Sequence, residues 1–511
     1  MKIAGNALSK IERDSDLYQK LLTAHTRIQK LDPMTWGEAA STEAAIRLNW
    51  VNLPSASRDL LPVLDALCAK FRDKNRIVLA GMGGSSLAPE VIAHTFNKEI
   101  FILDSTDPQY VAQALSGDLS KTLLIVSSKS GSTIETASAR SAFEKAFTDS
   151  SLPLSEHIVI VTDPDSPLDQ EARTQSLTVI NADPHVGGRF SALTAFGLVP
   201  AALIGVDVSL LLDSAADAKE SFIEDPYPLI DTAWAISALA GQYLGFTDQG
   251  SGLPGISDWI EQLIAESTGK SGVGRLPVVA ESVQSAKVGD AFTISFVESE
   301  ADLSVTGELG EHFIFWEWVT ALVGVALGVD PFNQPNVTEA KNATSSLLAE
   351  WGGIAPIISS EVSVGDVEIF GAGNTLEQAL TQFVAAIPID GYISIHAYLD
   401  RNQERHLLEL RSLLAKVSGR PVTFGWGPRF LHSTGQFHKG GQQNGAFLQI
   451  TGEAESDIAI PGKNFGFKTL VLAQALGDNN ALAERKFPLL RLNLINRSAG
   501  ITQILNAAKT I

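Results

Sequence analysis

The sequence predicts an α/β protein built from doubly wound parallel sheets, and two observations support this class. Short apolar runs that are typical of buried strands alternate with stretches of helical spacing. After two of these runs, which end at Ala80 and Val126, glycine and small polar residues follow directly and lead into a helix. In a doubly wound sheet, the loops at the carboxyl ends of the strands form the ligand site. The expected strands lie at residues 76–80, 101–104, 123–126 and 158–162.

Composition and charge indicate a globular chain without a nucleic-acid or membrane partner. The 511 residues are 45% hydrophobic and 19% charged, which suits roughly two to four domains with buried cores. The 38 basic and 58 acidic residues give a net charge of −20, which argues against binding to nucleic acid or to an anionic membrane surface. Any anionic ligand must therefore be held by local donors.

The cysteine count and the apolar runs indicate a cytoplasmic protein. Cys68 is the only cysteine, so neither a disulfide framework nor a cysteine-rich metal site is expected. Residues 1–16 contain no long apolar run and indicate no signal peptide. Residues 313–329 could pass for a membrane span, but they contain Glu317 and are short for a bilayer, so a buried core helix is expected.

The order of elements predicts four segments. Helical spacing gives an opening helical layer, and a long apolar helix is expected at residues 225–245. Near the C-terminus a strand, a helix and a strand are expected at residues 391–399, 402–417 and 421–425. The predicted segments are a helical layer at 1–73, a first phosphate-binding domain at 74–222, a second domain at 223–400, and a C-terminal α/β extension at 401–511 that completes the second domain and the active site.

Two polar loops follow the strands at residues 76–80 and 123–126. The first, Gly81-Met-Gly-Gly-Ser-Ser86, offers backbone N–H groups. It lacks the lysine of a Walker loop and the last glycine of a dinucleotide fingerprint, so both nucleotide classes are disfavoured. The second, residues 128–133, enters a helix and combines four hydroxyl groups with Lys129 and Gly131. That combination is typical of an anion site, and a simple helix cap is the alternative.

Three further residues are candidates for chemistry. Arg189 follows two glycines and precedes an apolar helix, where a guanidinium could stabilise an oxyanion or form a helix-start ion pair. Glu266 lies in the last turn of a helix predicted at residues 256–270, where the helix dipole disfavours a carboxylate. It is therefore either a functional base or a solvated surface glutamate. Lys341 lies on a helix that starts near Val337, a position where lysines usually face solvent.

The glycine-bounded segment at residues 427–441 contains two of the nine histidines, His432 and His438. A metal site is disfavoured, because no neighbouring carboxylate or third histidine supports the pair. An acid–base histidine is the better interpretation.

Five patches, taken in order, resemble the glucose-6-phosphate isomerase family, whose members contain two doubly wound sugar-isomerase domains. The chain as a whole, including Leu431-His-Ser-Thr-Gly-Gln436, is most similar to the isomerase half of fused transaldolase/glucose-6-phosphate isomerase proteins, and nothing in it resembles the transaldolase half. The patches are a GIGGS-type loop at 81–85, an SKSGTT-type loop at 128–133, a VGGRYS-type loop at 186–191, a QxxxESxGK segment at 262–270 and a DQxxVExxK-like segment at 333–341.

The resemblance implies reversible isomerisation of glucose 6-phosphate and fructose 6-phosphate through a cis-enediolate, in glycolysis and gluconeogenesis. It implies a small sugar phosphate as the partner and no metal or organic cofactor, and the apolar surplus allows a homodimer. By this resemblance Glu266 moves the proton, Arg189 holds the enediolate oxygen and Lys341 assists at the ring oxygen. The expected binding residues are Gly84, Ser85 and Gln262 for the sugar, and Ser128, Lys129, Ser130 and Thr133 for the phosphate.

The ring-opening histidine departs from the family pattern. Most members carry an LHSxGQ-like segment soon after the glutamate, whereas the matching segment here places His432 far downstream of Glu266. We expect His432 to supply this group, with His312 as the alternative. Two other functions stay open: a non-catalytic sugar-phosphate-binding regulator, and a dual phosphoglucose/phosphomannose isomerase.

Overall fold

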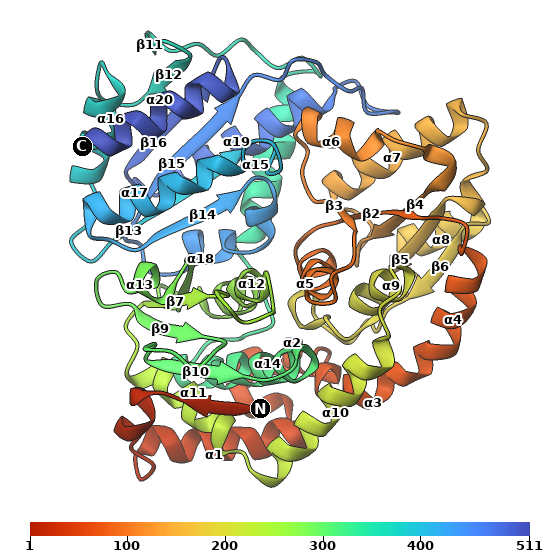
Figure 1. Ribbon diagram of the computed structural model, residues 1–511, viewed down its shortest axis with the longest axis vertical. Coiled ribbons are helices and arrows are strands. Elements are labelled where there is room, and N and C mark those ends of the chain that lie inside the picture. Colours follow the sequence, from red (N-terminus) through yellow and green to blue (C-terminus); the bar gives the residue numbers. More distant parts are fainter. The chain divides into compact units, whose positions relative to one another are not determined.

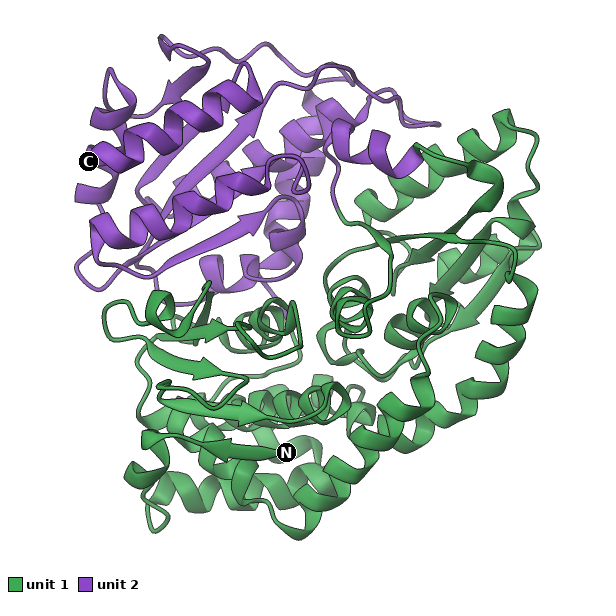
Figure 2. Ribbon diagram, viewed as in Figure 1, with its two compact units in different colours: residues 1–104, 116–333 green, residues 105–115, 334–511 purple.

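The computed structural model describes residues 1–511 and divides them into two compact units (Figures 1 and 2). The first unit holds residues 1–104 and 116–333, and the second holds residues 105–115 and 334–511. Each unit contains mainly parallel sheets flanked by helices, so the predicted α/β class is confirmed. The units do not follow the four predicted segments. The strands at residues 362–398 and those at residues 422–494 form one sheet, although the prediction assigned them to different segments.

The first sheet of the first unit is wholly parallel, in the order β3-β2-β4-β5-β6. All four strands predicted from the apolar runs are present, and their interior positions are buried. A fifth strand at the edge was not predicted. The strands are β2 (Arg76–Gly81), β3 (Phe101–Leu103), β4 (Thr122–Ser127), β5 (Ile158–Thr162) and β6 (Thr178–Asn181).

The second sheet of the first unit has the order β1-β10-β9-β7-β8, and only its N-terminal edge strand β1 runs antiparallel. The single long helix expected at residues 225–245 is wrong, because α11 ends at Ala238 and the chain then forms β7. An apolar run alone does not distinguish a buried helix from a buried strand. The strands are β1 (Lys2–Ala4), β7 (Tyr243–Thr247), β8 (Leu276–Val279), β9 (Phe292–Ser295) and β10 (Leu303–Thr306).

The second unit contains one six-stranded sheet in the order β11-β12-β16-β15-β13-β14. The four strands from β16 to β14 are parallel, and β11 and β12 form an antiparallel hairpin at one edge. Helices lie on both faces, since α15 packs on α19 while α16 and α17 pack on α20 (Figure 1). The strands are β11 (Val362–Val364), β12 (Val367–Phe370), β13 (Tyr392–Tyr398), β14 (Val422–Trp426), β15 (Gly445–Gly452) and β16 (Leu489–Leu494).

The helices of the two units differ in number and length. Those of the first unit are α1 (Asp16–Gln29), α2 (Glu38–Ala44), α3 (Leu53–Ala56), α4 (Leu61–Lys70), α5 (Leu87–Thr95), α7 (Ile134–Asp149), α8 (Pro167–Thr174), α9 (Ala195–Leu203), α10 (Val208–Glu224), α11 (Tyr227–Ala238), α12 (Ile256–Thr268), α13 (Val283–Ala286) and α14 (Leu309–Leu327). Those of the second unit are α6 (Pro108–Leu115), α15 (Val337–Glu350), α16 (Leu376–Ala385), α17 (Glu409–Ser418), α18 (Gly435–Gly440), α19 (Phe467–Glu484) and α20 (Arg497–Thr510).

The helix α14 is the buried core helix expected near residues 313–329. It starts at a capping box formed by Glu308 and Glu311 and stops at Gly328, which adopts a left-handed conformation. Nearly all of its side chains are buried, including Glu317, whose pKa burial raises well above its ordinary value. Burial therefore favours the neutral form of the Glu317 carboxyl group. No helix in the structure has both the length and the apolar character that are needed to span a membrane.

A buried polar network joins three elements of the second unit. Asp478 on α19 accepts a 2.6 Å hydrogen bond from Lys439 on α18, and its other oxygen lies 3.2 Å from Nδ1 of His396 on β13. Ser394 links the rings of His396 and His438 through contacts of 2.9 and 3.2 Å. Burial alone would raise the pKa of Asp478, but the Lys439 ammonium and His396 hold it well below its ordinary value. The network fixes α18, where the sequence indicated only a loop.

We expect Asp478→Asn to destabilise the second unit by about 3–5 kcal/mol, because Lys439 would be left as an uncompensated buried charge. The depressed pKa of Asp478 gives the sign of the pH dependence. Its stabilisation is present above the unfolded value of about 3.9 and is lost as the pH falls through the folded value.

Native-state hydrogen exchange at β13 and β15 measures this effect, since a chain of two units need not unfold in one step. Glu484→Gln, at an exposed position near the end of the same helix, is the matched control and should change stability by at most about 0.5 kcal/mol. Equal protection in the two variants would contradict the assignment.

Candidate functional site

The two polar loops of the first unit lie at the same edge of the first sheet. β2 and β4 are parallel neighbours, and Gly81 at the end of one strand pairs with Ser127 at the end of the other. The loop after Gly81 contains a short helical turn at residues 83–85, and the loop after Ser127 leads into α7. The sequence-based prediction that both loops meet at the carboxyl edge is confirmed by this register.

Gly84 brings the first loop against the loop that carries Arg189. A Cβ atom at Gly84 would lie 1.9 Å from the carbonyl oxygen of Gly188. No side chain fits in that space, so the two backbones touch directly. Ser85 follows at a half-buried position beside this contact. The close approach places the predicted sugar-contacting residues Gly84 and Ser85 next to the predicted oxyanion-binding arginine.

The hydroxyl groups of the loop at residues 128–133 interact mainly with one another and with the backbone of the loop. The hydroxyl of Ser128 accepts a 3.2 Å hydrogen bond from the backbone N–H of Gly131, while Ser130 and Ser132 share a 2.8 Å hydrogen bond. Thr133 is the N-cap residue of α7, yet its side chain makes no capping hydrogen bond. Ser130 and Ser132 are exposed, and the hydroxyl of the half-buried Thr133 lies 3.5 Å from that of Ser128 rather than at the helix end.

Gly131 gives this loop its shape. It has a φ of +72°, and a Cβ atom there would lie 2.5 Å from Cβ of Leu168 in the first turn of α8. Only glycine combines that left-handed conformation with so close a neighbour.

Lys129 points toward the neighbouring strand rather than toward the loop hydroxyls. Its ammonium lies 2.5 Å from Asp163, which follows β5, and donates a 3.3 Å hydrogen bond to the carbonyl of Pro184. Burial lowers the pKa of Lys129 and raises that of Asp163, and each partner counteracts the other's shift. The charge expected at the phosphate loop is thus partly neutralised by a carboxylate that the sequence did not single out.

Arg189 and Glu266 form a buried ion pair. Nη1 of Arg189 lies 3.1 Å from Oε1 of Glu266, and Nε of Arg189 donates a 2.8 Å hydrogen bond to Ser267. The other oxygen of Glu266 accepts a 3.1 Å hydrogen bond from Gln262, one turn earlier on α12. Burial lowers the pKa of Arg189, and the charge of Glu266 counteracts that shift. Three predicted residues from two distant segments are thereby in direct contact.

Lys270 adds a second buried cation that sequence reasoning did not select. Its ammonium donates a hydrogen bond to the carbonyl of Asp330, and its pKa is lowered well below the ordinary value by burial and then by the charge of Arg189. Lys270 is the final residue of the QxxxESxGK segment, so this motif could have identified it as a site residue. Arg189 and Lys270 therefore both lie close enough to Glu266 to interact with its charge.

Lys341 and His432 belong to the second unit. Lys341 is exposed on α15, and His432 ends a short helical turn at residues 429–432, just before α18. Asn336 and Gln436 exchange two hydrogen bonds of 2.9 and 2.8 Å that tie the start of α15 to α18. The segment that carries His432 is therefore held directly against the helix that carries Lys341.

His312, the alternative histidine, is fully buried on α14. Its ring contacts Phe296 edge-on, and neither ring nitrogen has a hydrogen-bond partner. Burial lowers the pKa of His312 to about 3. A ring so enclosed and so difficult to protonate does not suit proton exchange with a sugar.

Comparisons with known proteins support the family resemblance over part of the chain. Residues 67–293 match the model of the phosphoglucose isomerase family, so the resemblance inferred from the five patches is confirmed over that segment. The chain is 31% identical over 274 residues to a probable glucose-6-phosphate isomerase of Haloquadratum walsbyi, covering 52% of this chain and 61% of that protein. It is 36% identical over 210 residues to a glucose-6-phosphate isomerase of Synechococcus sp. (strain JA-3-3Ab), covering 37% and 39%.

These matches leave part of each relative uncovered. The chain spans 61% and 39% of the two curated relatives' own length. The crystal structure of a glucose-6-phosphate isomerase from Chlamydia trachomatis is similar over 67% of this chain and 88% of that one, with a TM-score of 0.55 and 19% identity. At that identity the similarity shows the fold.

The contact at Gly84 gives a prediction for the integrity of the site. We expect Gly84→Ala to destabilise the first unit by about 1–3 kcal/mol, because its methyl group would force the two loops apart. Gly187→Ala is the matched control, since no atom lies within 4 Å of a Cβ atom there and the residue has an ordinary extended conformation.

Hydrogen exchange at β2 and β4 measures the difference between these two variants. If Gly84→Ala left the protection of both strands at the level of Gly187→Ala, the proposed loop contact would be wrong.

Proposed function

We propose that this chain interconverts glucose 6-phosphate and fructose 6-phosphate by proton transfer through a cis-enediolate. The observation that carries the proposal is the buried contact between Glu266, Arg189 and Gln262 beside the first polar loop. The match to the phosphoglucose isomerase family over residues 67–293 supports the same activity. A cytoplasmic role in sugar metabolism, expected from the sequence, belongs to this proposal.

Glu266 would act as the base that moves a proton between C2 and C1 of the open-chain sugar. When the carboxylate of Glu266 takes the proton it becomes neutral, while negative charge develops on the enediolate oxygen of the substrate. The charge of Arg189 is then no longer balanced by Glu266 and can stabilise that oxygen instead. The ion pair in the resting site thus supplies a cation at the moment when the substrate becomes an anion.

The hydroxyl groups at residues 128–133 and the N-terminus of α7 would hold the phosphate group. This end of the substrate does not react, so these donors position the sugar rather than take part in the proton transfer. Lys129 would contribute less than a free ammonium, because Asp163 already pairs with it. Lys341 and His432 would assist ring opening, a role that follows from the resemblance.

A coupled assay for glucose 6-phosphate formation from fructose 6-phosphate tests the proposal. We expect Glu266→Gln to lower kcat roughly 10²–10⁴-fold, because an amide cannot accept the proton. In D2O the wild-type enzyme should place deuterium at C2, since a proton held on Glu266 exchanges with solvent. Glu224→Gln, at the exposed end of α10, is the matched control and should retain full activity. An inactive wild-type protein would refute the proposal.

His432 has its own test. We expect His432→Ala to lower kcat about 10²-fold or more with little change in KM, since a lost acid slows ring opening without removing phosphate contacts. His406→Ala, at an exposed position of the same unit, serves as the control. Full activity of the His432 variant would exclude it as the ring-opening group.

Two alternatives remain distinguishable. A sugar-phosphate-binding regulator would bind fructose 6-phosphate without turning it over, and it would not need a base such as Glu266. A dual isomerase would also accept mannose 6-phosphate, which the same assay detects when that sugar is supplied.

A further inference from the structure

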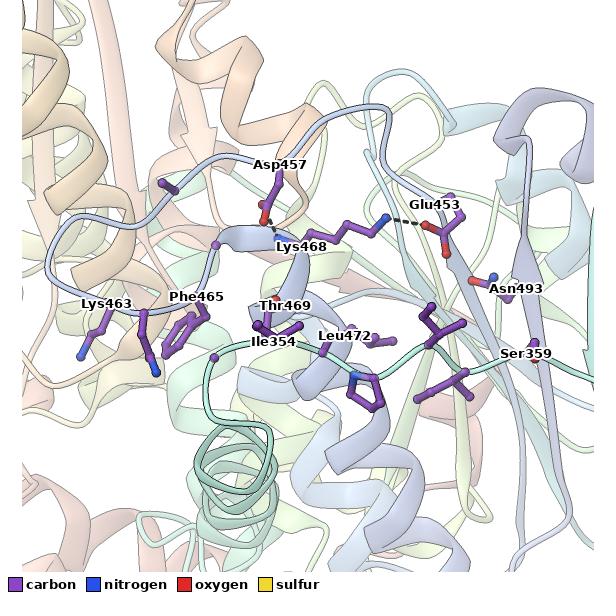
Figure 3. A pocket seen from close by; sticks show the side chains of 18 of the residues that line it. Ile354, Ser359, Glu453, Asp457, Lys463, Phe465, Lys468, Thr469, Leu472 and Asn493 are labelled. Carbon is purple, nitrogen blue, oxygen red and sulfur yellow. Dashed lines mark hydrogen bonds and ion pairs between the residues drawn. The ribbon is translucent and has the colours of Figure 1, made fainter.

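A groove in the second unit lies apart from every residue assigned above. Its volume of about 960 Å³ is within the range of small-molecule sites. The walls are the extended segment at residues 353–359, the loop at residues 457–466 with the first turn of α19, and side chains of β12 and β16 (Figure 3). None of the predicted catalytic or sugar-binding residues lines it.

The acidic side chains in this groove already have partners. Glu453 forms an ion pair of 2.5 Å with Lys468, as Figure 3 shows. Asp457 caps α19, since one of its oxygens accepts 2.8 Å hydrogen bonds from the backbone N–H groups of Ile458 and Lys468. Glu368 accepts a 2.8 Å hydrogen bond from Asn493. None of these three carboxylates forms an ion pair with Arg491.

Arg491 is a largely buried cation of the groove that forms no ion pair. It lies on β16 with only 8% of its surface exposed, and its guanidinium stacks 3.4 Å above the ring centre of Phe370. The side chain makes no hydrogen bond or ion pair, although Glu368 attracts it from a distance. Burial lowers the pKa of Arg491 to about 10, so the group remains charged at neutral pH.

A stacked guanidinium keeps its hydrogen-bond donors in the plane of the group, at its edge. Stacking on Phe370 stabilises the charge over one face but satisfies none of the five N–H donors. The guanidinium nitrogens are not enclosed, so these donors face the groove that Arg491 lines. An anion in the groove would satisfy these donors, and Arg491 can bind carboxylate or phosphate in a bidentate manner.

The rest of the lining indicates an organic rather than an inorganic anion. Ile354 and Ile357 are 81% and 98% exposed at the rim, and Phe465 and Leu472 add further apolar surface. Lys463, which forms no ion pair, adds a second positive charge to the lining. Exposed isoleucines beside an unpaired guanidinium match a ligand that has an apolar part and an acidic group.

We propose that this groove binds a small organic anion, with its phosphate or carboxylate against Arg491 and its apolar part against Ile354 and Ile357. The site is separate from the proposed isomerase site and does not depend on that activity. It would let the second unit sense an acidic metabolite other than the substrate.

The fluorescent anion 8-anilinonaphthalene-1-sulfonate is a suitable probe, because it combines aromatic rings with one acidic group. We expect it to bind the full chain, and Arg491→Gln to raise its Kd about tenfold or more, as expected for the loss of a charge-assisted hydrogen bond. Arg405→Gln, at an exposed arginine outside the groove, should leave the Kd unchanged. Equal affinity of the wild type and Arg491→Gln would overturn the proposal.

A variant at the rim tests the same site without altering the buried core. Ile357→Glu places a negative charge beside the groove and should weaken binding of the probe severalfold. Ile389→Glu makes the same change at another isoleucine of this unit, which is 80% exposed and does not line the groove. An equal effect of the two substitutions would show that the probe responds to net charge alone and would refute the site.

Phenyl phosphate and benzoate distinguish the two acidic groups, because they carry the same ring. The stronger competitor against the probe identifies whether the groove prefers a phosphate or a carboxylate, and its advantage should disappear in Arg491→Gln. Failure of both compounds to displace the probe from the wild type would overturn the proposal.

Discussion

The buried guanidinium of Arg189 is the constraint on which the candidate site depends. A charge removed from water must be surrounded by acceptors. Arg189 finds them in Glu266 and Ser267 on α12, and in the carbonyl groups of Pro331 and Asn333 after α14. One side chain therefore holds three segments that are far apart in sequence, and a rearrangement of any of them would leave the charge unsatisfied.

This constraint also explains the backbone contact at Gly84. The short helical turn that carries Arg189 must lie deep enough to reach α12, which brings the carbonyl of Gly188 against the first polar loop. A glycine on the opposing loop is then required by space. Gly84 therefore allows one loop to lie directly against another, in addition to any role in bringing the backbone close to a ligand.

Much of the first unit could be predicted from local patterns. The strands of the first sheet and the polar loops after β2 and β4 follow from apolar runs that end in glycine and hydroxyl residues. Long-range features could not be predicted in the same way. The partner of Lys129 is Asp163, in the loop after β5, and the pairing of Arg189 with Glu266 depends on packing between elements rather than on spacing. The edge strand β6 was missed because its residues are only partly buried and its pattern is weak.

The second unit shows a similar limit in its polar core. His396, His438 and Asp478 lie on β13, α18 and α19, so no local motif connects them. In the structure they form one buried network with Lys439 and Ser394. The same α18 carries Gln436, whose paired hydrogen bonds with Asn336 hold the start of α15. Two sets of contacts therefore set the position of the His432 segment: the buried ion pair between Lys439 and Asp478, and the paired hydrogen bonds between Gln436 and Asn336. A histidine in a relocated segment can serve a reaction only if that segment is rigid, and these two sets of contacts provide the rigidity that the sequence alone could not reveal.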